Sequence, residues 1–204
     1  VAARLTTLAE LAPLLASAYA DIAPTNNVAQ VAYKSSALEP SSLDEAPTTT
    51  EIAGMLSTRM QERRNEEIAR GLCLVGPHRD DLTLTLGDLP TKGYASHGEC
   101  WSTALALRLA SFALLQADGG APVLVLDDVF AELDESRRSR LAELIAGAEQ
   151  VLITAAVAAD VPSALQGRRF TVAGGTVVED RAVESATVAE LDEAPEPVRL
   201  VEHV

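Results

Sequence analysis

Two adjacent carboxylates follow a short apolar run in the second half of the sequence. The run VLVL at 123–126 is typical of a buried parallel strand, and Asp127 and Asp128 come directly after it. In open α/β sheets the carboxyl ends of strands are where ligands bind. One carboxylate can hold Mg²⁺ through water, and its neighbour can orient or deprotonate an attacking water. The alternative is that both acids only cap a helix that begins near Glu135.

A second group of residues with chemical potential opens the longest predicted helix. The string ASHGE at 95–99 places Ser96 and Gly98 at the start of a helix over 96–117. Small residues leave the first backbone N–H groups of a helix exposed, and these donors, with the Ser96 hydroxyl, suit a phosphate. The alternative is an ordinary capping box, S-x-x-E, completed by Glu99.

Periodicity and turn residues predict the elements that position these groups. Apolar residues at helical spacing predict helices, and period-two or short continuous apolar runs predict strands. The predicted helices cover 1–23, with a kink or break at Pro13, then 51–70, 96–117 and 135–146; strands cover 28–36, part of 71–90, 123–126 and 150–154, with a hairpin over 168–180. Strand, helix and strand at this spacing form a parallel βαβ unit, so the fold class is α/β.

Charge and composition exclude several function classes. The net charge is −14, from 30 acids against 16 bases, which argues against wide non-specific binding to a phosphate backbone. Cys73 and Cys100 lack a metal-type or redox-type spacing. No run reaches the roughly 18 uncharged apolar residues of a membrane span, so we expect a cytoplasmic protein without membrane contact. From residue 180 onward acids dominate, and we expect a disordered acidic tail over 180–204.

Taken in order, these motifs resemble those of ABC-type ATPases. The helix start with small, polar, glycine and acidic residues matches the signature motif. After the long helix, the buried strand with its carboxylate pair matches Walker B, and the E-L-D string that follows matches the D-loop. Three strings, GPHRDDL at 76–82, ASHGE at 95–99 and LDDVFAELD at 126–134, resemble the C-terminal half of the RecF family, bacterial recombination-mediator ATPases related to SMC proteins. The resemblance implies the C-terminal lobe of an ABC/SMC-type ATPase head, preceded by part of a helical arm.

The resemblance implies roles for the carboxylate pair and the loop after it. Asp127 would hold Mg²⁺, and Asp128 would orient the hydrolytic water. Asp128 is one methylene shorter than the glutamate usual in ABC transporters, which favours slow hydrolysis suited to a switch. Thr154 stands where transporters place a switch histidine and would be a sensor. The D-loop that crosses a dimer interface would consist of Ala131, Glu132, Leu133 and Asp134.

Further residues take their implied roles from the same family. Ser96, Gly98 and Glu99 would form the signature that closes over the γ-phosphate of ATP bound to the opposite subunit. GPHRDD is a family hallmark whose role the sequence does not give: Arg79 facing phosphate and Arg79 bracing the lobe junction both stay open, beside the alternative of a solvated loop. Its remaining polar members are His78, Asp80 and Asp81. The arginines proposed for DNA contact are Arg59, Arg63 and Arg64.

The implied function is an ATP-dependent homodimer that clamps DNA near single-strand gaps. With RecO and RecR, such a protein supports RecA loading in repair, replication restart and the SOS response. The expected domains are an arm over 1–70, the head over 71–179 and the tail over 180–204. No G-x-x-x-x-G-K-[ST] is present, and the chain begins without Met, so we expect a fragment of a protein nearly twice as long that does not bind ATP alone.

Two alternatives remain from the sequence. One alternative is a non-catalytic dimerisation or interaction module, and the other is the head of another SMC-like chromosome clamp. Long coiled-coil heptads would indicate that clamp, and none occur over 1–70.

Overall fold

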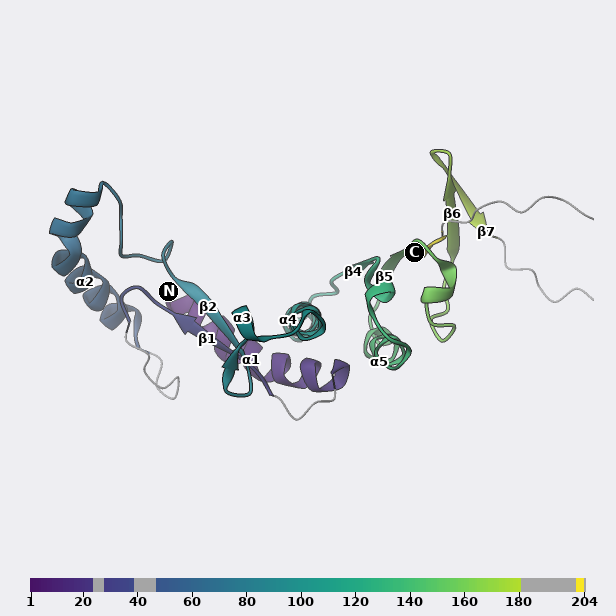
Figure 1. Cartoon of the computed structure of the whole chain (residues 1–204), viewed down its shortest axis with the longest axis horizontal. Coiled ribbons are helices and arrows are strands. Elements are labelled where there is room, and N and C mark those ends of the chain that lie inside the picture. Colours follow the sequence, from purple (N-terminus) through teal and green to yellow (C-terminus); the bar gives the residue numbers. More distant parts are fainter. Residues whose placement is uncertain (24–27, 39–46, 181–200, 204) are drawn as a thin grey trace, which may run out of the picture. The chain divides into compact units, whose positions relative to one another are not determined.

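The computed structural model describes residues 1–23, 28–38, 47–180 and 201–203, and the chain divides into two compact units (Figure 1). The first unit, Val1–Asp118, contains α1 (Ala2–Ile22), β1 (Ala29–Lys34), α2 (Thr49–Arg70), β2 (Asp81–Leu86), β3 (Leu89–Pro90), α3 (Thr91–Tyr94) and α4 (His97–Ala117). The second unit, Gly119–Val204, contains β4 (Leu124–Asp127), the 3₁₀ turn η1 (Val129–Glu132), α5 (Glu135–Ile145), β5 (Val151–Ala155), η2 (Ala158–Asp160), β6 (Arg169–Ala173), β7 (Thr176–Asp180) and β8 (Val201–His203).

The core of the first unit forms where α1 packs against α4 and β1. The α1 residues at helical spacing are buried, with Leu15, Tyr19 and Ile22 fully inaccessible. Burying a side chain of this size contributes about 1.5–3 kcal/mol, so these three residues anchor the helix. The predicted break at Pro13 does not occur, since α1 runs on as one helix through this residue.

A small antiparallel sheet completes this unit. β1 pairs with β2 from Ala29 opposite Leu86 to Lys34 opposite Asp81, and β2 pairs with β3. The strand predicted over 28–36 and the strand predicted within part of 71–90 are confirmed. In contrast, residues 71–80 contain no strand. The N–H groups of Leu74 and Val75 donate to Glu67 Oε1, so a side chain takes the donors that a strand partner would use.

The apolar face predicted for α2 is not a core face in the structure. Ile52 is its one fully buried residue, and Met55, Met60 and Ile68 are exposed. The helix is held at its ends instead. Thr48 and Glu51 form a capping box, and Gly71 ends the helix with a positive φ of 64° that glycine adopts without steric cost.

The second unit is built on a five-stranded sheet in the order β4-β5-β8-β6-β7. β4 and β5 are parallel and α5 connects them, which confirms the predicted βαβ unit. β6 and β7 form the predicted hairpin, which turns at Gly174 and Gly175, both with positive φ. Among the described residues of this unit, Phe130, Leu141 and Ile145 are the most deeply buried, with 1% exposure or less.

The predicted acidic tail lies mostly outside the described residues, namely at 181–200 and 204. Its segment Val201–His203, however, forms β8, which pairs antiparallel with both β5 and β6. A count of charges reports solvation and carries no information about backbone pairing, so it did not predict this strand.

α4 has the length and mean hydropathy of a membrane-spanning helix. In the first unit, however, it packs against α1, and it buries Leu105, Ala106, Leu109 and Ala110. Packing in the first unit therefore accounts for the apolar residues on the buried face of α4.

Candidate functional site

The predicted carboxylate pair lies at the carboxyl end of β4, beside the parallel strand β5. The parallel register places Asp127 opposite Thr154. The Thr154 hydroxyl donates to Asp127 Oδ1 (2.5 Å) and accepts a hydrogen bond from the Asp128 N–H (3.1 Å). The same N–H also donates to the Thr154 carbonyl (3.1 Å). Three residues singled out by the sequence are thus brought together by one sheet register.

Asp128 has an unusual backbone conformation. Its φ of 51° and ψ of 24° are left-handed, and it is the one non-glycine residue with positive φ in the described ranges. Asp tolerates this region better than most residues, at a cost of roughly 1–2 kcal/mol. Strained residues of this kind gather at functional sites. Both carboxylates are exposed, so a ligand can reach them.

The oxygen donors at this edge of the sheet fit Mg²⁺ bound together with substrate phosphates better than a metal ion held by protein side chains alone. Over the residues that the structure describes, no three His, Cys, Asp or Glu side chains come together to hold a metal ion. Mg²⁺ is commonly bound by one or two carboxylates together with substrate phosphates, and it keeps several waters. An exposed Asp127, fixed by a hydroxyl, suits that mode.

The predicted D-loop residues form η1 and the junction to α5. Phe130 and Leu133 are buried, with 0% and 4% exposure, while Ala131 and Glu132 between them are exposed. Asp134 is the N-cap of α5, and its Oδ1 accepts a hydrogen bond from the Arg137 N–H (2.9 Å). Two buried side chains therefore anchor a short exposed tip.

The signature residues form the start of α4 in the first unit. Ser96 is the N-cap, and its N–H and hydroxyl both donate to Glu99 Oε2 (2.8 Å each). The Glu99 N–H donates to Ser96 Oγ (3.3 Å). The Ser96 backbone and side-chain hydrogen bonds hold the pKa of Glu99 below its ordinary value. The capping box considered from the sequence is therefore present, and Gly98 lies in the first turn behind it.

The GPHRDD motif is organised around Asp80. Its carboxylate accepts hydrogen bonds from Tyr33 Oη (2.6 Å), the Ser36 N–H (2.7 Å) and Ser36 Oγ (2.8 Å). Arg4 donates to the Pro77 carbonyl (2.7 Å) and to Tyr33 Oη (3.2 Å). Burial acts to raise the pKa of Asp80, but the Tyr33 and Ser36 hydrogen bonds outweigh it and the pKa is lowered. Asp80 thus ties the end of β1 to the turn before β2.

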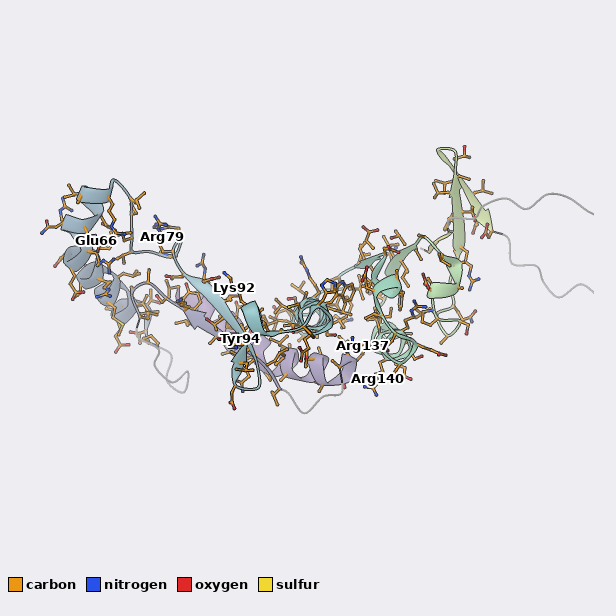
Figure 2. All side chains as sticks on the ribbon, in the orientation of Figure 1. Glu66, Arg79, Lys92, Tyr94, Arg137 and Arg140 are labelled. Atoms are coloured by element: carbon orange, nitrogen blue, oxygen red, sulfur yellow. The ribbon has the colours of Figure 1, made fainter. Side chains whose placement is uncertain are left out.

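The other polar members of the motif, His78, Arg79 and Asp81, are exposed. Arg79 donates from Nε to the Cys73 carbonyl (2.6 Å), so it braces the turn on which it lies (Figure 2). Asp81 begins β2, and His78 lies at the surface. This contact is with its own loop, so the two roles left open for Arg79, facing phosphate and bracing the lobe junction, stay predictions.

Replacing Asp80 by Asn should destabilise the first unit by about 2 kcal/mol at pH 7, because the half-buried Tyr33 and Ser36 donors lose their charged acceptor. The folded-state pKa of Asp80 lies below its ordinary value, so its contribution is complete above the unfolded pKa and is lost as the pH falls through the folded one. The difference between the variant and the unsubstituted chain should therefore shrink in acid. Urea unfolding at pH 7 and in acid measures both effects. Asp88→Asn, at an exposed turn, is the control, and equal midpoints for Asp80→Asn and Asp88→Asn at pH 7 would contradict the assignment.

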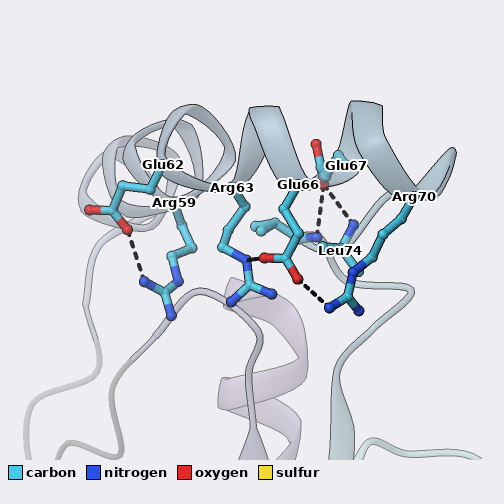
Figure 3. Close-up of polar contacts among 8 residues, drawn as sticks. Arg59, Glu62, Arg63, Glu66, Glu67, Arg70 and Leu74 are labelled. Atoms are coloured by element: carbon cyan, nitrogen blue, oxygen red, sulfur yellow. Dashed lines mark hydrogen bonds and ion pairs between the residues drawn. The ribbon is translucent and has the colours of Figure 1, made fainter.

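The arginines considered for DNA contact lie on a charge-compensated helix. Figure 3 shows Arg59 paired with Glu62 (2.8 Å), and Glu66 between Arg63 and Arg70 (2.8 Å each). Arg64 forms no ion pair with any residue in the described part of the chain. The formal charges of α2 cancel, with the arginines matched by Glu51, Glu62, Glu66 and Glu67. A phosphate backbone would have to compete with these glutamates.

Sequence reasoning missed several residues that hold these groups in place. Tyr33, Ser36 and Arg4 support Asp80 from positions far along the chain, which no local pattern reports. Arg138, at the fourth position after Asp134, binds the backbone of the D-loop. Its place in the first turns of α5, directly after the ELD string, is the one signal in the sequence that points to it.

Comparison with curated proteins finds relatives that are all named DNA replication and repair protein RecF. The DNA replication and repair protein RecF of Beutenbergia cavernae is 52% identical over 198 residues, which cover 89% of this chain and 50% of the relative. The protein of the same description from Streptomyces avermitilis is 56% identical over 177 residues (87% and 46%), and that from Rhodococcus erythropolis is 50% identical over 204 residues (96% and 50%). The chain spans about half the length of these curated relatives.

Solved structures agree with this result. The recombination mediator protein RecF-ATPrS in the RecFOR pathway matches with a TM-score of 0.71 at 26% identity, over 87% of this chain and 46% of that one. RecF-ATP in the RecFOR pathway matches with a TM-score of 0.69 at 24% identity, over 87% and 45%. No family model matches the chain. The predicted α/β ATPase-head fold is confirmed by these neighbours.

Proposed function

Because this chain belongs to the RecF family over the half of those proteins that it spans, we propose that it supplies the Walker B, D-loop and signature half of a DNA-repair ATPase. One observation carries the proposal. Asp127 ends β4 and Asp128 follows it, and Thr154 of the parallel neighbour β5 binds the Asp127 carboxylate and the Asp128 N–H. An exposed carboxylate pair with its backbone fixed at that edge is suited to a metal-bound nucleotide.

The residues of this chain have distinct tasks in hydrolysis. Bound Mg²⁺ would neutralise charge on the phosphates of ATP. Asp127 would hold the ion, and the Thr154 hydrogen bond fixes which carboxylate oxygen remains free for it. Asp128 would orient and accept a proton from the attacking water. A single carboxylate on a short side chain acts over a limited reach, so slow turnover suited to a switch is proposed.

The signature and D-loop would act on a nucleotide held by another subunit. Ser96, Gly98 and the start of α4 supply N–H and hydroxyl donors, and the exposed Ala131 and Glu132 supply a contact surface. ATP would then stand between two subunits in a homodimer. Glu99, as an ionised carboxylate, accepts hydrogen bonds and does not donate them, so its share would be through its backbone N–H.

The finer biological role follows the family. We propose that the complete protein acts in the cytoplasm, binds gapped or duplex DNA as an ATP-dependent dimer and works with RecO and RecR to support RecA loading in repair, replication restart and the SOS response. DNA contact through Arg59, Arg63 and Arg64 would require those side chains to exchange their glutamate partners for phosphates. Arg64 is the member best placed for it.

A second candidate is a module that dimerises through the same surfaces without turning ATP over. The absence of a G-x-x-x-x-G-K-[ST] string from this sequence favours it for the chain taken alone. Without the backbone nest and lysine of a P-loop, little in this half can hold a triphosphate.

The test compares this chain with the same chain joined to the N-terminal half of a RecF relative. Both are assayed for Mg-ATP binding by calorimetry and for DNA-stimulated hydrolysis. We expect binding and hydrolysis from the joined protein and neither from the 204-residue chain. Tight binding by the short chain alone would contradict the proposed roles of Asp127 and Asp128, and binding without hydrolysis by the joined protein would favour the non-catalytic module.

A further inference from the structure

One arginine in the second unit links three segments around the candidate site. Arg138, in α5, donates from Nε to the carbonyls of Phe130 and Leu133 (2.8 Å each). Its Nη1 forms an ion pair with Asp160 Oδ1 (2.9 Å). Asp160 ends η2, the turn that follows the strand containing Thr154. The side chain thus connects α5, η1 and the segment after β5.

The two carbonyls bound by Arg138 flank the exposed tip, which we define as Ala131 and Glu132. Phe130 and Leu133 are buried on either side of it, and the Leu133 N–H also donates to the Phe130 carbonyl (3.2 Å). The tip is therefore closed at its base by one backbone hydrogen bond, two buried side chains and one guanidinium. Its own residues remain at the surface.

The chemistry of this contact requires arginine. The planar guanidinium presents donors in a fixed fork, so Nε serves the two carbonyls while Nη1 reaches the carboxylate. A lysine ammonium is a compact point charge on a flexible stem, and it has no planar fork that fixes donors toward the carbonyls and toward the carboxylate at once. The Arg138 and Asp160 side chains are 25% and 22% exposed, so water screens their pairing only in part.

We propose that Arg138 is a positioning residue that holds the tip in one shape, ready to contact a second subunit. A loop ordered before association loses less conformational entropy when it binds. The Asp160 link also makes the tip and the segment after β5 move together. This inference rests on the proposed function, in which the tip lies at an ATP-dependent dimer interface.

The first test uses the 204-residue chain and hydrogen exchange of its backbone amides. Arg138→Lys should speed exchange of the Leu133 amide about tenfold, because the base of the tip opens more often. Asp160→Asn should have a smaller effect, since the carbonyl contacts stay. Arg168→Lys, which alters an arginine paired with Glu179 on the hairpin side of the same unit, is the matched control and should leave Leu133 unchanged.

The second test uses the protein joined to the N-terminal half. Arg138→Lys should lower kcat for ATP and ATP-driven dimerisation about tenfold, while KM for ATP stays within twofold, since the tip acts on association. Unchanged exchange at Leu133, or faster exchange spread evenly over α5 and β5, overturns the inference. Faster exchange confined to the tip with normal dimerisation supports the positioning role and overturns the proposed place of the tip at the interface.

Discussion

Asp128→Asn, made in the protein that carries both halves, should slow ATP hydrolysis by about 10²–10³-fold and prolong the ATP-bound dimer. The amide has the shape of the carboxylate but cannot accept a proton from water. Asn also adopts the left-handed region readily, so the φ of 51° at this position is kept. ATP affinity should therefore change by less than about threefold, because the proposed contact of Asp127 with the ion would stay intact.

Single-turnover hydrolysis and the lifetime of the dimer, followed by light scattering, measure this prediction. Asp118→Asn removes an exposed charge at the end of α4 and should leave both quantities unchanged. If Asp128→Asn lowers ATP affinity as strongly as it lowers the rate, Asp128 binds the nucleotide and does not act on water. A normal rate would remove it from the chemistry altogether.

Ser96→Arg should weaken ATP-driven dimerisation by more than about 100-fold while each subunit still binds ATP, because the proposed phosphate contact is made across the interface. A long cation in place of an exposed N-cap hydroxyl fills the space that a phosphate would occupy at the start of α4. Sedimentation with and without ATP measures dimerisation, and calorimetry measures binding to the monomer.

The chain provides a matched control for this substitution. Thr48 and Glu51 form the same kind of capping box at α2, in the same unit. Thr48→Arg therefore removes an equivalent cap without touching the signature, and it should leave dimerisation unchanged. Normal dimerisation of Ser96→Arg would show the signature assignment to be wrong, whereas equal losses in both variants would point to damaged helix caps.

The elements that depend on local pattern could be predicted from the sequence. Apolar spacing predicted α1 and its buried face, and the continuous apolar run predicted the strand β4. The predicted burial of the whole run was wrong, because Leu124 and Leu126 are buried whereas Val123 and Val125 are exposed. The position of Asp127 and Asp128 follows from that run. Their contact with Thr154 does not, since it depends on the register of β4 against β5 across 27 residues.

Other features depend on what a segment meets far along the chain. The apolar residues of α2 have helical spacing, but burial requires a second surface, and Met55, Met60 and Ile68 remain exposed. The residues next to Asp80 in the sequence predict a solvated acid in a loop. Its role as a central acceptor is visible only when β1 brings Tyr33 and Ser36 beside it. Propensity and spacing carry no information about such encounters.

The cap at the start of α4 has a consequence for anion selectivity. The two Ser96 donors that a phosphate would use already serve the Glu99 carboxylate. An incoming phosphate must displace this carboxylate, because two negative groups cannot share the same donors at hydrogen-bond distance. Free phosphate and other small anions therefore compete with a tethered acceptor that is always present. In the proposed dimer, a nucleotide held by the partner subunit would have the local concentration to displace Glu99, so Glu99 would block the start of α4 until such a partner binds.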